Sequence, residues 1–263
     1  MEYFVWDIDP NILKFGALQL RWYGVLFVGS FFIGLAIMQW IYKREGKDPK
    51  VLDNFLIYIV VGVVVGARLM HCFAYEPDYY LSNPVEILYV WKGGLASHGG
   101  MLGAILALYM FSKRYKKDFV WLLSRVAIAG MVTAAFVRIG NFFNSEILGL
   151  ETTKPWAVIF ARVDNLPRHP VQLYEASAYL IILLILLWIY RKASFDFATK
   201  ILPGVFLLLL FGARFLIEYT KTEQADYNTI VPLTVGQMLS VPFVILGLLW
   251  TLWAIFLSSK DNR

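Results

Sequence analysis

The chain has 263 residues, of which 59% are hydrophobic and only 16% are charged, and its mean hydropathy is +0.61. The charged fraction lies well below the roughly 25% of an average soluble domain, which excludes an ordinary soluble globular protein. A net charge of +5 could indicate a nucleic-acid-binding protein. The distribution of the basic residues is instead that of a membrane protein with basic cytoplasmic connections, so no nucleic-acid partner is expected.

The apolar residues are concentrated in blocks of about 20, the length with which an α-helix crosses a hydrocarbon core ~30 Å thick. In chain order we predict seven transmembrane helices, at residues 22–41, 51–69, 94–111, 119–137, 171–190, 201–219 and 233–257. The opening stretch MEYFVWDIDP is acidic and has no cleavage site, so it is not predicted to be a removable signal peptide. The expected fold class is a single all-α polytopic membrane domain over residues 1–263, with outer loops that form a small head.

The basic residues alternate between the predicted connections. Thirteen of the 24 lysines and arginines lie in four regions, at residues 43–50, 113–117, 191–200 and 260–263. Because cytoplasmic connections of membrane proteins are rich in lysine and arginine, these four regions are expected to be cytoplasmic. Seven spans then place the N-terminus outside and the C-terminus inside. The connections at about 70–93, 138–170 and 220–232 are expected on the outer face.

The densest polar cluster follows the fourth span, in VRIGNFFNSEILG at residues 137–149. Its polar members alternate with apolar ones and are Arg138, Asn141, Asn144 and Glu146. This mixture predicts a turn that dips into the membrane interface, where Gly140 and Gly149 would permit a tight backbone. An ordinary amphipathic surface loop is the alternative.

A second candidate group lies in the sixth predicted span. Arg214 is five residues before Tyr219, hence about 7 Å below the outer end of the helix. Glu218 follows four residues after Arg214, on the same helical face, so the two are expected to pair. An ionisable residue inside a membrane marks a functional site by default, although a purely structural ion pair is the alternative.

The third candidate is His98, within the small-residue stretch GGLASHGG. An imidazole ring changes its charge near neutral pH, so His98 is a candidate proton acceptor. The glycines around it are expected to leave a groove that a ligand or a backbone can approach closely, although small residues also promote close helix packing in membranes. Tyr23 lies at the outer end of the first span, where aromatic-belt residues are common.

Together these residues predict a site that is open to the outer leaflet. Arginines bind phosphate oxygens well, so arginines at headgroup depth predict a phospholipid or another anionic amphiphile as ligand. A nearby base then favours group transfer or hydrolysis. The main alternative is a small-solute or anion transporter. Two observations argue against it: the polar residues cluster at one face of the membrane, and the sequence shows no internal repeat. An intramembrane serine protease lacks its motif, and a retinal-type receptor lacks a lysine in residues 233–257.

Four stretches, GGLASHGGMLGA, RIGNFFNSE, HPVQLYEA and GARFLIEY, together resemble the bacterial prolipoprotein diacylglyceryl transferases. The resemblance extends from about residue 20 to the last predicted span. The family pattern G-R-x-G-N-F-x-N-x-E is met from Arg138 to Glu146. Val137 and Ser145 depart from it, since both stand where glycine is common.

The resemblance implies transfer of the diacylglyceryl group of phosphatidylglycerol to the lipobox cysteine thiol of a prolipoprotein, with release of glycerol phosphate. It implies the outer face of the bacterial cytoplasmic (inner) membrane as the location, and neither cofactor nor metal. The implied catalytic residues are Arg138 and Arg214, which would hold the phosphate, and His98 as the general base or its relay, a role for which Glu146 competes. The implied substrate-binding residues are Tyr23, Asn141, Asn144, Gly149, which would permit the turn, and Glu218, which would orient Arg214.

Overall fold

The computed structural model describes residues 2–15, 18–222 and 233–261. The chain divides into two compact units, Met1–Ile37 with Ser124–Arg263 (unit 1) and Met38–Leu123 (unit 2). The boundaries fall inside helices α1 (Trp22–Arg44) and α5 (Phe119–Asn144). The single domain stays a prediction, and each unit is described by itself. Residues 223–232 of the predicted outer connection 220–232 lie outside the described residues.

Within the described residues, six helices are long and apolar enough to cross a membrane. They are Trp22–Arg44, Val51–Tyr75, Phe119–Asn144, Val171–Lys192, Phe195–Glu218 and Val235–Lys260. A seventh helix, α4 (Ser97–Arg114), takes the place of the predicted span 94–111 but is less apolar. Its first turn contains His98, and its last turn contains Lys113 and Arg114. The chain is therefore a mostly helical, multi-pass membrane protein, and the count of seven spans stays a prediction.

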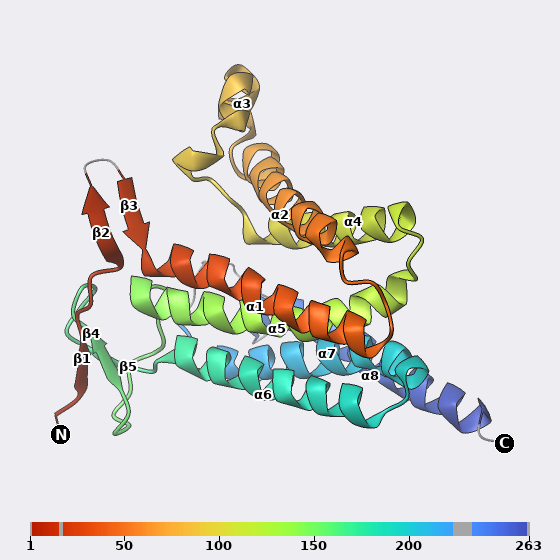
Figure 1. Ribbon diagram of the computed structural model, residues 1–263. Coiled ribbons are helices and arrows are strands. Elements are labelled where there is room, and N and C mark those ends of the chain that lie inside the picture. Colours follow the sequence, from red (N-terminus) through yellow and green to blue (C-terminus); the bar gives the residue numbers. More distant parts are fainter. Residues whose placement is uncertain (1, 16–17, 223–232, 262–263) are drawn as a thin grey trace. The chain divides into compact units, whose positions relative to one another are not determined.

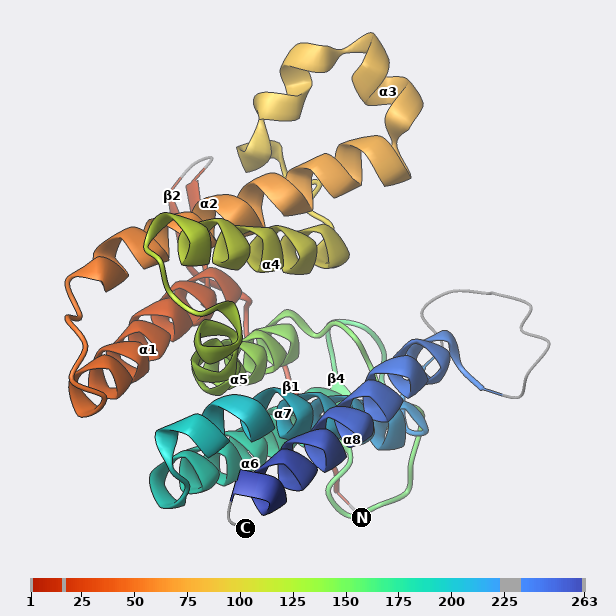
Figure 2. The same ribbon diagram turned by 90° about the vertical axis from the view of Figure 1, so that its right-hand side faces the viewer.

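Unit 2 is built on the packing of α2 (Val51–Met70) against α4, which lie side by side (Figure 2). Glycines form the contact. A Cβ atom on Gly66 would lie 2.8 Å from the Cα atom of Gly103, and one on Gly62 would lie 2.6 Å from the Cβ atom of Ala107. The backbone of α2 therefore occupies the space beside Gly99 and Gly103, where we expected a groove. Here the glycines of the GGLASHGG region serve close helix packing.

The segment between α2 and α4 begins with one π-helical stretch, η1 (His71–Tyr75), followed by α3 (Pro77–Ser82), η2 (Pro84–Leu88) and η3 (Val90–Lys92). Arg68 at the end of α2 holds this segment in place. Its guanidinium is buried and donates hydrogen bonds to the carbonyl oxygens of Glu86, Ile87, Gly93 and Gly94. Arg68 therefore has a structural role.

In unit 1, α7 (Phe195–Glu218) packs against both α6 (Val171–Lys192) and α8 (Val235–Asp261), and the three helices run side by side (Figures 1 and 2). Helix α7 begins six residues before the predicted span 201–219. The reason is the Ser194 side chain, which accepts a hydrogen bond from the Phe197 backbone N–H and so caps the helix. Asp196 and Lys200 are part of the helix and form an i,i+4 ion pair.

The head of unit 1 contains short strands, which the all-α expectation missed. Strand β1 (Phe4–Trp6) pairs in parallel with β4 (Val158–Phe160), and β5 (Pro167–Arg168) pairs antiparallel with β4. A separate hairpin joins β2 (Asn11–Phe15) to β3 (Leu18–Arg21). Strands this short carry almost no alternating pattern that a sequence reading could detect.

Helix α5 determines the position of the polar cluster. It continues seven residues beyond the predicted end at residue 137 and ends at Asn144, so the expected interfacial turn is wrong for Arg138 to Asn144. Aromatic packing supports this extension. The Phe142 ring lies 4.4 Å from the ring of Trp6 and 5.5 Å from that of Phe160, while Phe143 stacks on Trp22 at 5.0 Å. The apolar residues of the motif therefore anchor the helix end to the head.

Candidate functional site

The last two turns of α5 place three polar residues on one face. Arg138, Asn141 and Asn144 are three residues apart, the spacing of neighbours on a helix surface. Arg138 Nη1 donates to Asn141 Oδ1 (3.3 Å), and the Asn141 amide donates in turn to Glu146 Oε1 (2.6 Å). Asn144 also donates to Glu146 Oε1 (3.2 Å). The structure thus brings all four predicted residues of this motif into one hydrogen-bonded chain.

The turn that positions Glu146 follows directly after the helix. Ser145 and Ile147 both have positive φ, +54° and +57°. This conformation is energetically unfavourable for every residue except glycine. Two hydrogen bonds hold it, from the Glu146 backbone N–H to the Asn141 carbonyl (3.1 Å) and from the buried Gln172 amide to the Glu146 carbonyl (2.8 Å). The glycines of the motif do not supply the positive φ, contrary to our expectation.

Gly140 instead permits a close approach of Tyr23. A Cβ atom on Gly140 would lie 2.7 Å from Cδ2 of the Tyr23 ring. The Tyr23 hydroxyl lies near enough to Arg138 and Glu146 for both charges to act on it. The predicted site residue Tyr23 therefore belongs to the same cluster as the motif on α5.

Gly149 also serves close packing. A Cβ atom there would lie 2.7 Å from the Cβ atom of His169 and 2.9 Å from a methyl group of Val171. Its carbonyl accepts a hydrogen bond from Arg168 Nη1 (3.1 Å). Arg168 in turn binds Asp164, and this hydrogen-bonded pair holds the pKa of the Asp164 carboxyl below its usual value. Gly149 therefore joins the end of the motif to the start of α6, and the expected turn function is wrong.

A buried carboxylate lies at the centre of the cluster. The Glu175 side chain, in the second turn of α6, is completely buried. Its Oε2 lies 3.0 Å from Arg138 Nε, and its Oε1 lies 2.8 Å from the Nζ of Lys221. The Tyr179 hydroxyl is 3.4 Å from the same Oε1. Glu175 thus binds two cations from distant parts of the chain.

Lys221 extends the cluster to the C-terminal end of α7. Its buried ammonium also lies 3.3 Å from Oε2 of Glu218, so Glu218 pairs with Lys221 where we expected it to pair with Arg214. Within the described residues, Arg214 forms no ion pair with Glu218. Both Arg214 and Arg138 lie near enough to the Tyr179 hydroxyl for their charges to act on it. The charges of both predicted arginines therefore act on the same phenol group.

His98 belongs to unit 2 and is described with that unit. It is an exposed residue in the first turn of α4. The Ala96 backbone N–H donates to the Ala67 carbonyl of α2 (3.0 Å), which fixes the start of this helix. Arg68, through its bonds to the carbonyls of Gly93 and Gly94, holds the chain just before it.

Sequence reasoning missed Glu175, Lys221 and Gln172 as members of the site. Glu175 and Gln172 stand in the stretch HPVQLYEA, to which we assigned no site role beyond resemblance. A signal was present, because Gln172, Glu175 and Tyr179 are spaced by three and four residues and so share one helical face at the start of α6. Lys221 gave no such signal, since it looks like an ordinary lysine after a membrane helix.

The arrangement suits an anionic ligand. A guanidinium has five N–H donors in a planar fork. Asn141 accepts a hydrogen bond from Nη1 of Arg138, and Glu175 forms an ion pair beside its Nε. The remaining donors are fixed in direction, and the Arg138 side chain is 15% exposed, so a ligand can reach it. Oriented arginine donors of this kind bind phosphate oxygens and stabilise negative charge that develops during a reaction.

Comparison with known proteins identifies relatives over almost the whole chain. A family model described as prolipoprotein diacylglyceryl transferase matches residues 10–253. The chain is 48% identical over 258 residues to a phosphatidylglycerol–prolipoprotein diacylglyceryl transferase of Tolumonas auensis, with 98% of each chain covered. A protein of the same name from Chloroherpeton thalassium is 48% identical over 249 residues, covering 94% of this chain and 93% of the relative. One from Bacteroides fragilis is 36% identical over 255 residues, covering 92% of both.

Proposed function

The chain belongs to the prolipoprotein diacylglyceryl transferase family, and we propose that it transfers the diacylglyceryl group of phosphatidylglycerol to the lipobox cysteine thiol of a prolipoprotein. Glycerol phosphate is released, and the product is the first intermediate of bacterial lipoprotein maturation. The observation that carries this proposal is the clamped Arg138, whose guanidinium is held by Glu175 and Asn141 with donors left for a phosphate. The names of the relatives give the transporter alternative no support.

The reaction exchanges one bond for another at a glycerol carbon. The cysteine thiol gives up its proton to a base, because the thiolate is the effective nucleophile. The sulfur then forms a bond to the glycerol carbon that carries the phosphate, and the carbon–oxygen bond breaks. The electron pair stays on the phosphate oxygen, so negative charge grows on the leaving group, where arginine donors stabilise it.

Each predicted residue receives a role in this scheme. Arg138 and Arg214 bind the phosphate, and Asn141 and Asn144 bind the headgroup while they orient Glu146. His98 is proposed as the base or its relay, and Glu146 is the competing candidate. Tyr23 lines the outer cavity. Gly149 allows close packing between the end of the motif and the start of α6. Glu218 forms an ion pair with Lys221 and so acts on the cluster through that lysine.

We place the enzyme in the bacterial cytoplasmic (inner) membrane with the site at its outer face. This assignment rests on the alternation of basic residues between the connections, which predicts seven spans with the N-terminus outside and the C-terminus inside. A lipid that donates its diacylglyceryl group already lies in the bilayer, and a secreted precursor reaches the outer face.

The test is direct transfer in detergent. The purified protein is mixed with phosphatidylglycerol and a synthetic lipobox peptide, and mass spectrometry measures the diacylglyceryl adduct on the peptide cysteine. We expect the parent chain to form the adduct. Arg138→Ala should form it at least about a hundredfold more slowly, as for loss of one transition-state donor. His98→Gln should also form much less adduct.

Two outcomes would change the proposal. Full activity of His98→Gln would assign the base to Glu146 or to solvent. Absence of an adduct from a well-folded parent chain, with phosphatidylglycerol recovered intact, would overturn the transferase. A matched control is Arg162→Ala, which removes a half-exposed arginine whose one ion pair within the described residues joins it to Asp9 in the head.

A further inference from the structure

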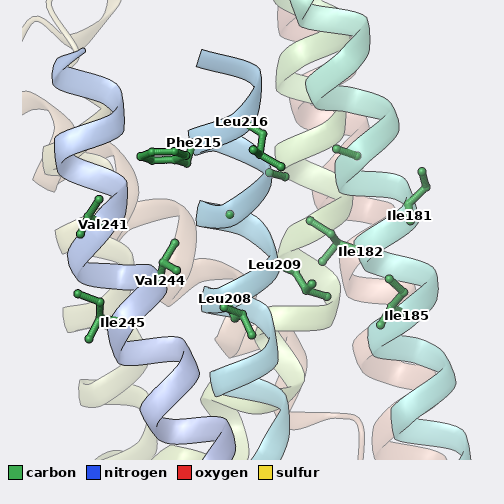
Figure 3. A pocket seen from close by; sticks show the side chains of 13 residues that line it. Ile181, Ile182, Ile185, Leu208, Leu209, Phe215, Leu216, Val241, Val244 and Ile245 are labelled. Atoms are coloured by element: carbon green, nitrogen blue, oxygen red, sulfur yellow. The ribbon is translucent and has the colours of Figure 1, made fainter. Parts of the chain in front are cut away.

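An apolar groove lies over α7, between α6 and α8, with a volume of about 700 Å³. Figure 3 shows α7 at the floor of the groove, with side chains of α6 and α8 on either side. All thirteen residues that line it are apolar, and they include Ile182, Leu208, Gly212, Ala213 and Val244. The volume is that of a small-molecule site, about 300–1,000 Å³, but without polar groups to bind anything except hydrocarbon.

We infer that this groove holds an acyl chain of the phospholipid donor, an inference that rests on the proposed transferase function. The position of the groove relative to the charged cluster is the first argument. All three helices that form the groove also carry the cluster toward their outer ends: Glu175 on α6, Arg214 and Glu218 on α7, and Gly236 on α8, whose backbone faces the Glu218 carboxylate. A charged end followed by an apolar channel is the arrangement that a phospholipid requires.

The spacing along the helices is the second argument. The lining residues on α6, Ala178 to Ile185, follow Glu175 by three to ten positions, or about 5–15 Å at ~1.5 Å per residue. Those on α7 reach from Leu216 to Leu208, six positions, or about 9 Å, inward from Arg214. Those on α8 begin five positions after Gly236. On each helix the groove therefore begins within two turns of the charges and continues inward, as an acyl chain does below its phosphate.

The floor of the groove is the third argument. A Cβ atom added to Gly212 would meet no heavy atom of the described residues within 4 Å, so the lack of a side chain there leaves open space. The other glycines that join α7 to α8 differ, because a Cβ atom on Gly204 would lie 2.7 Å from the Thr251 backbone nitrogen. Gly204 is needed for helix packing, whereas Gly212 only keeps the groove empty.

The first test is photocrosslinking, which requires no catalysis. Phosphatidylglycerol with a diazirine in one acyl chain is bound to the parent chain in nanodiscs, irradiated, and mapped by peptide mass spectrometry. We expect adducts concentrated in residues 178–185, 208–216 and 241–245. Adducts spread evenly over all lipid-facing helix surfaces would overturn the inference. A second experiment places Leu209→Cys in a Cys72→Ala background. A disulfide between two such copies would also overturn the inference, because a second copy of the chain would then occupy the groove.

The second test fills the groove. Gly212→Leu is expected to reduce the adducts in the groove severalfold. It should also change chain-length preference, measured as the ratio of kcat/KM for phosphatidylglycerol with 16-carbon chains to kcat/KM for phosphatidylglycerol with 6-carbon chains. We expect this ratio to fall by about tenfold, because about two methylenes of the long chain lose their burial. Gly29→Leu on α1 is the matched control, because a Cβ atom on Gly29 also meets nothing within 4 Å. Ala213→Leu serves as a second filling variant should Gly212→Leu fold poorly.

The two proposals fail in different ways. If the parent chain transfers the diacylglyceryl group but Gly212→Leu and Ala213→Leu keep the parental chain-length preference, the groove inference is wrong and the transferase stands. If the parent chain transfers nothing, yet the adducts lie in the groove and disappear on filling, the groove binds phospholipid chains and the transferase proposal fails.

Discussion

Arg138 Nε lies 3.0 Å from Oε2 of Glu175, and the Glu175 side chain is completely buried. This contact joins the C-terminal part of α5 to the start of α6 and gives the guanidinium a fixed direction. A buried charge pair of this kind differs from a surface pair, because breaking it leaves an uncompensated charge away from water. The pair therefore links the stability of the fold to the geometry of the proposed phosphate site.

The first prediction concerns the charge of Glu175. Glu175→Gln keeps the shape of the side chain but leaves Arg138 and Lys221 without their shared anion. We expect a loss of about 3–5 kcal/mol in the free energy of unfolding, as for removal of one partner of a buried ion pair. Chemical denaturation in detergent measures this loss. Glu2→Gln, at an exposed position, is the control and should be neutral within about 0.5 kcal/mol. Equal stability of both variants would show that Glu175 carries no charge.

The second prediction concerns the buried ammonium of Lys221. Lys221→Met removes the charge that lies 2.8 Å from Glu175 and 3.3 Å from Glu218, so within the described residues Glu175 keeps only its ion pair with Arg138 and Glu218 keeps none. We expect KM for phosphatidylglycerol to rise by about tenfold, because a cluster with less positive charge binds phosphate more weakly. Lys221→Arg keeps the charge and should bring KM most of the way back to the parental value. An unchanged KM in a folded Lys221→Met variant would mean that Lys221 has no electrostatic effect on the substrate.

The sequence predicted the main helices and the polar motif well, since blocks of about 20 apolar residues leave few alternatives in a membrane. The end of α5 was predicted incorrectly because Arg138, Asn141 and Asn144 appear polar to a hydropathy reading, although they share one face of a continuing helix. The head strands, of two to five residues, carried too little pattern. Glu175 was seen but received no role, because its two cations come from residues 37 positions before it and 46 positions after it.

Contacts between distant residues also explain the incorrect glycine roles. Gly140 and Gly149 looked like turn residues, but the space beside them is filled by Tyr23 and His169, which no local pattern reveals. In this turn the residues with positive φ are Ser145 and Ile147, which local propensity argues against. The predicted pair of Arg214 and Glu218 had the correct helical spacing, yet Lys221 lies on the other side of Glu218 and takes its carboxylate.

The third prediction follows from the strained turn. Ser145 has φ +54° and a buried hydroxyl that has no hydrogen-bond partner within the described residues. Ser145→Gly removes both costs and adds only the greater backbone entropy of glycine, so we expect about 1 kcal/mol of added stability. Ser30→Gly, in the interior of α1, is the opposite control: it lowers helix propensity and removes the hydrogen bonds of the buried Ser30 hydroxyl to the Phe27 carbonyl and to Thr133, so it should destabilise by at least about 1 kcal/mol. Denaturation midpoints that shift in the same direction for both variants would contradict the strain at Ser145.

The fourth prediction concerns the protonation of His169. Trp156 Nε1 donates to the Tyr174 hydroxyl (2.7 Å), whose own proton is therefore available for His169 Nδ1 at 3.0 Å. A neutral ring that carries its proton on Nε2 satisfies this arrangement. Burial, and secondly the charge of Lys154, hold the pKa of His169 below its ordinary value of 6.5. The unfolded chain therefore binds more protons, so this contribution to stability is complete above pH ~6.5 and is lost as the pH falls through the lowered pKa.

We expect an NMR titration of the three histidines, with His169 assigned through His169→Asn, to give His169 a midpoint below 6.5. Lys154→Gln should raise this midpoint because it removes a nearby positive charge that opposes protonation. Lys192→Gln is the control, since Lys192 is exposed at the other end of α6, about 32 Å along the helix from Val171. A midpoint at or above 6.5, or one that Lys154→Gln leaves unchanged, would contradict the proposed effects of burial and of Lys154 on the pKa of His169.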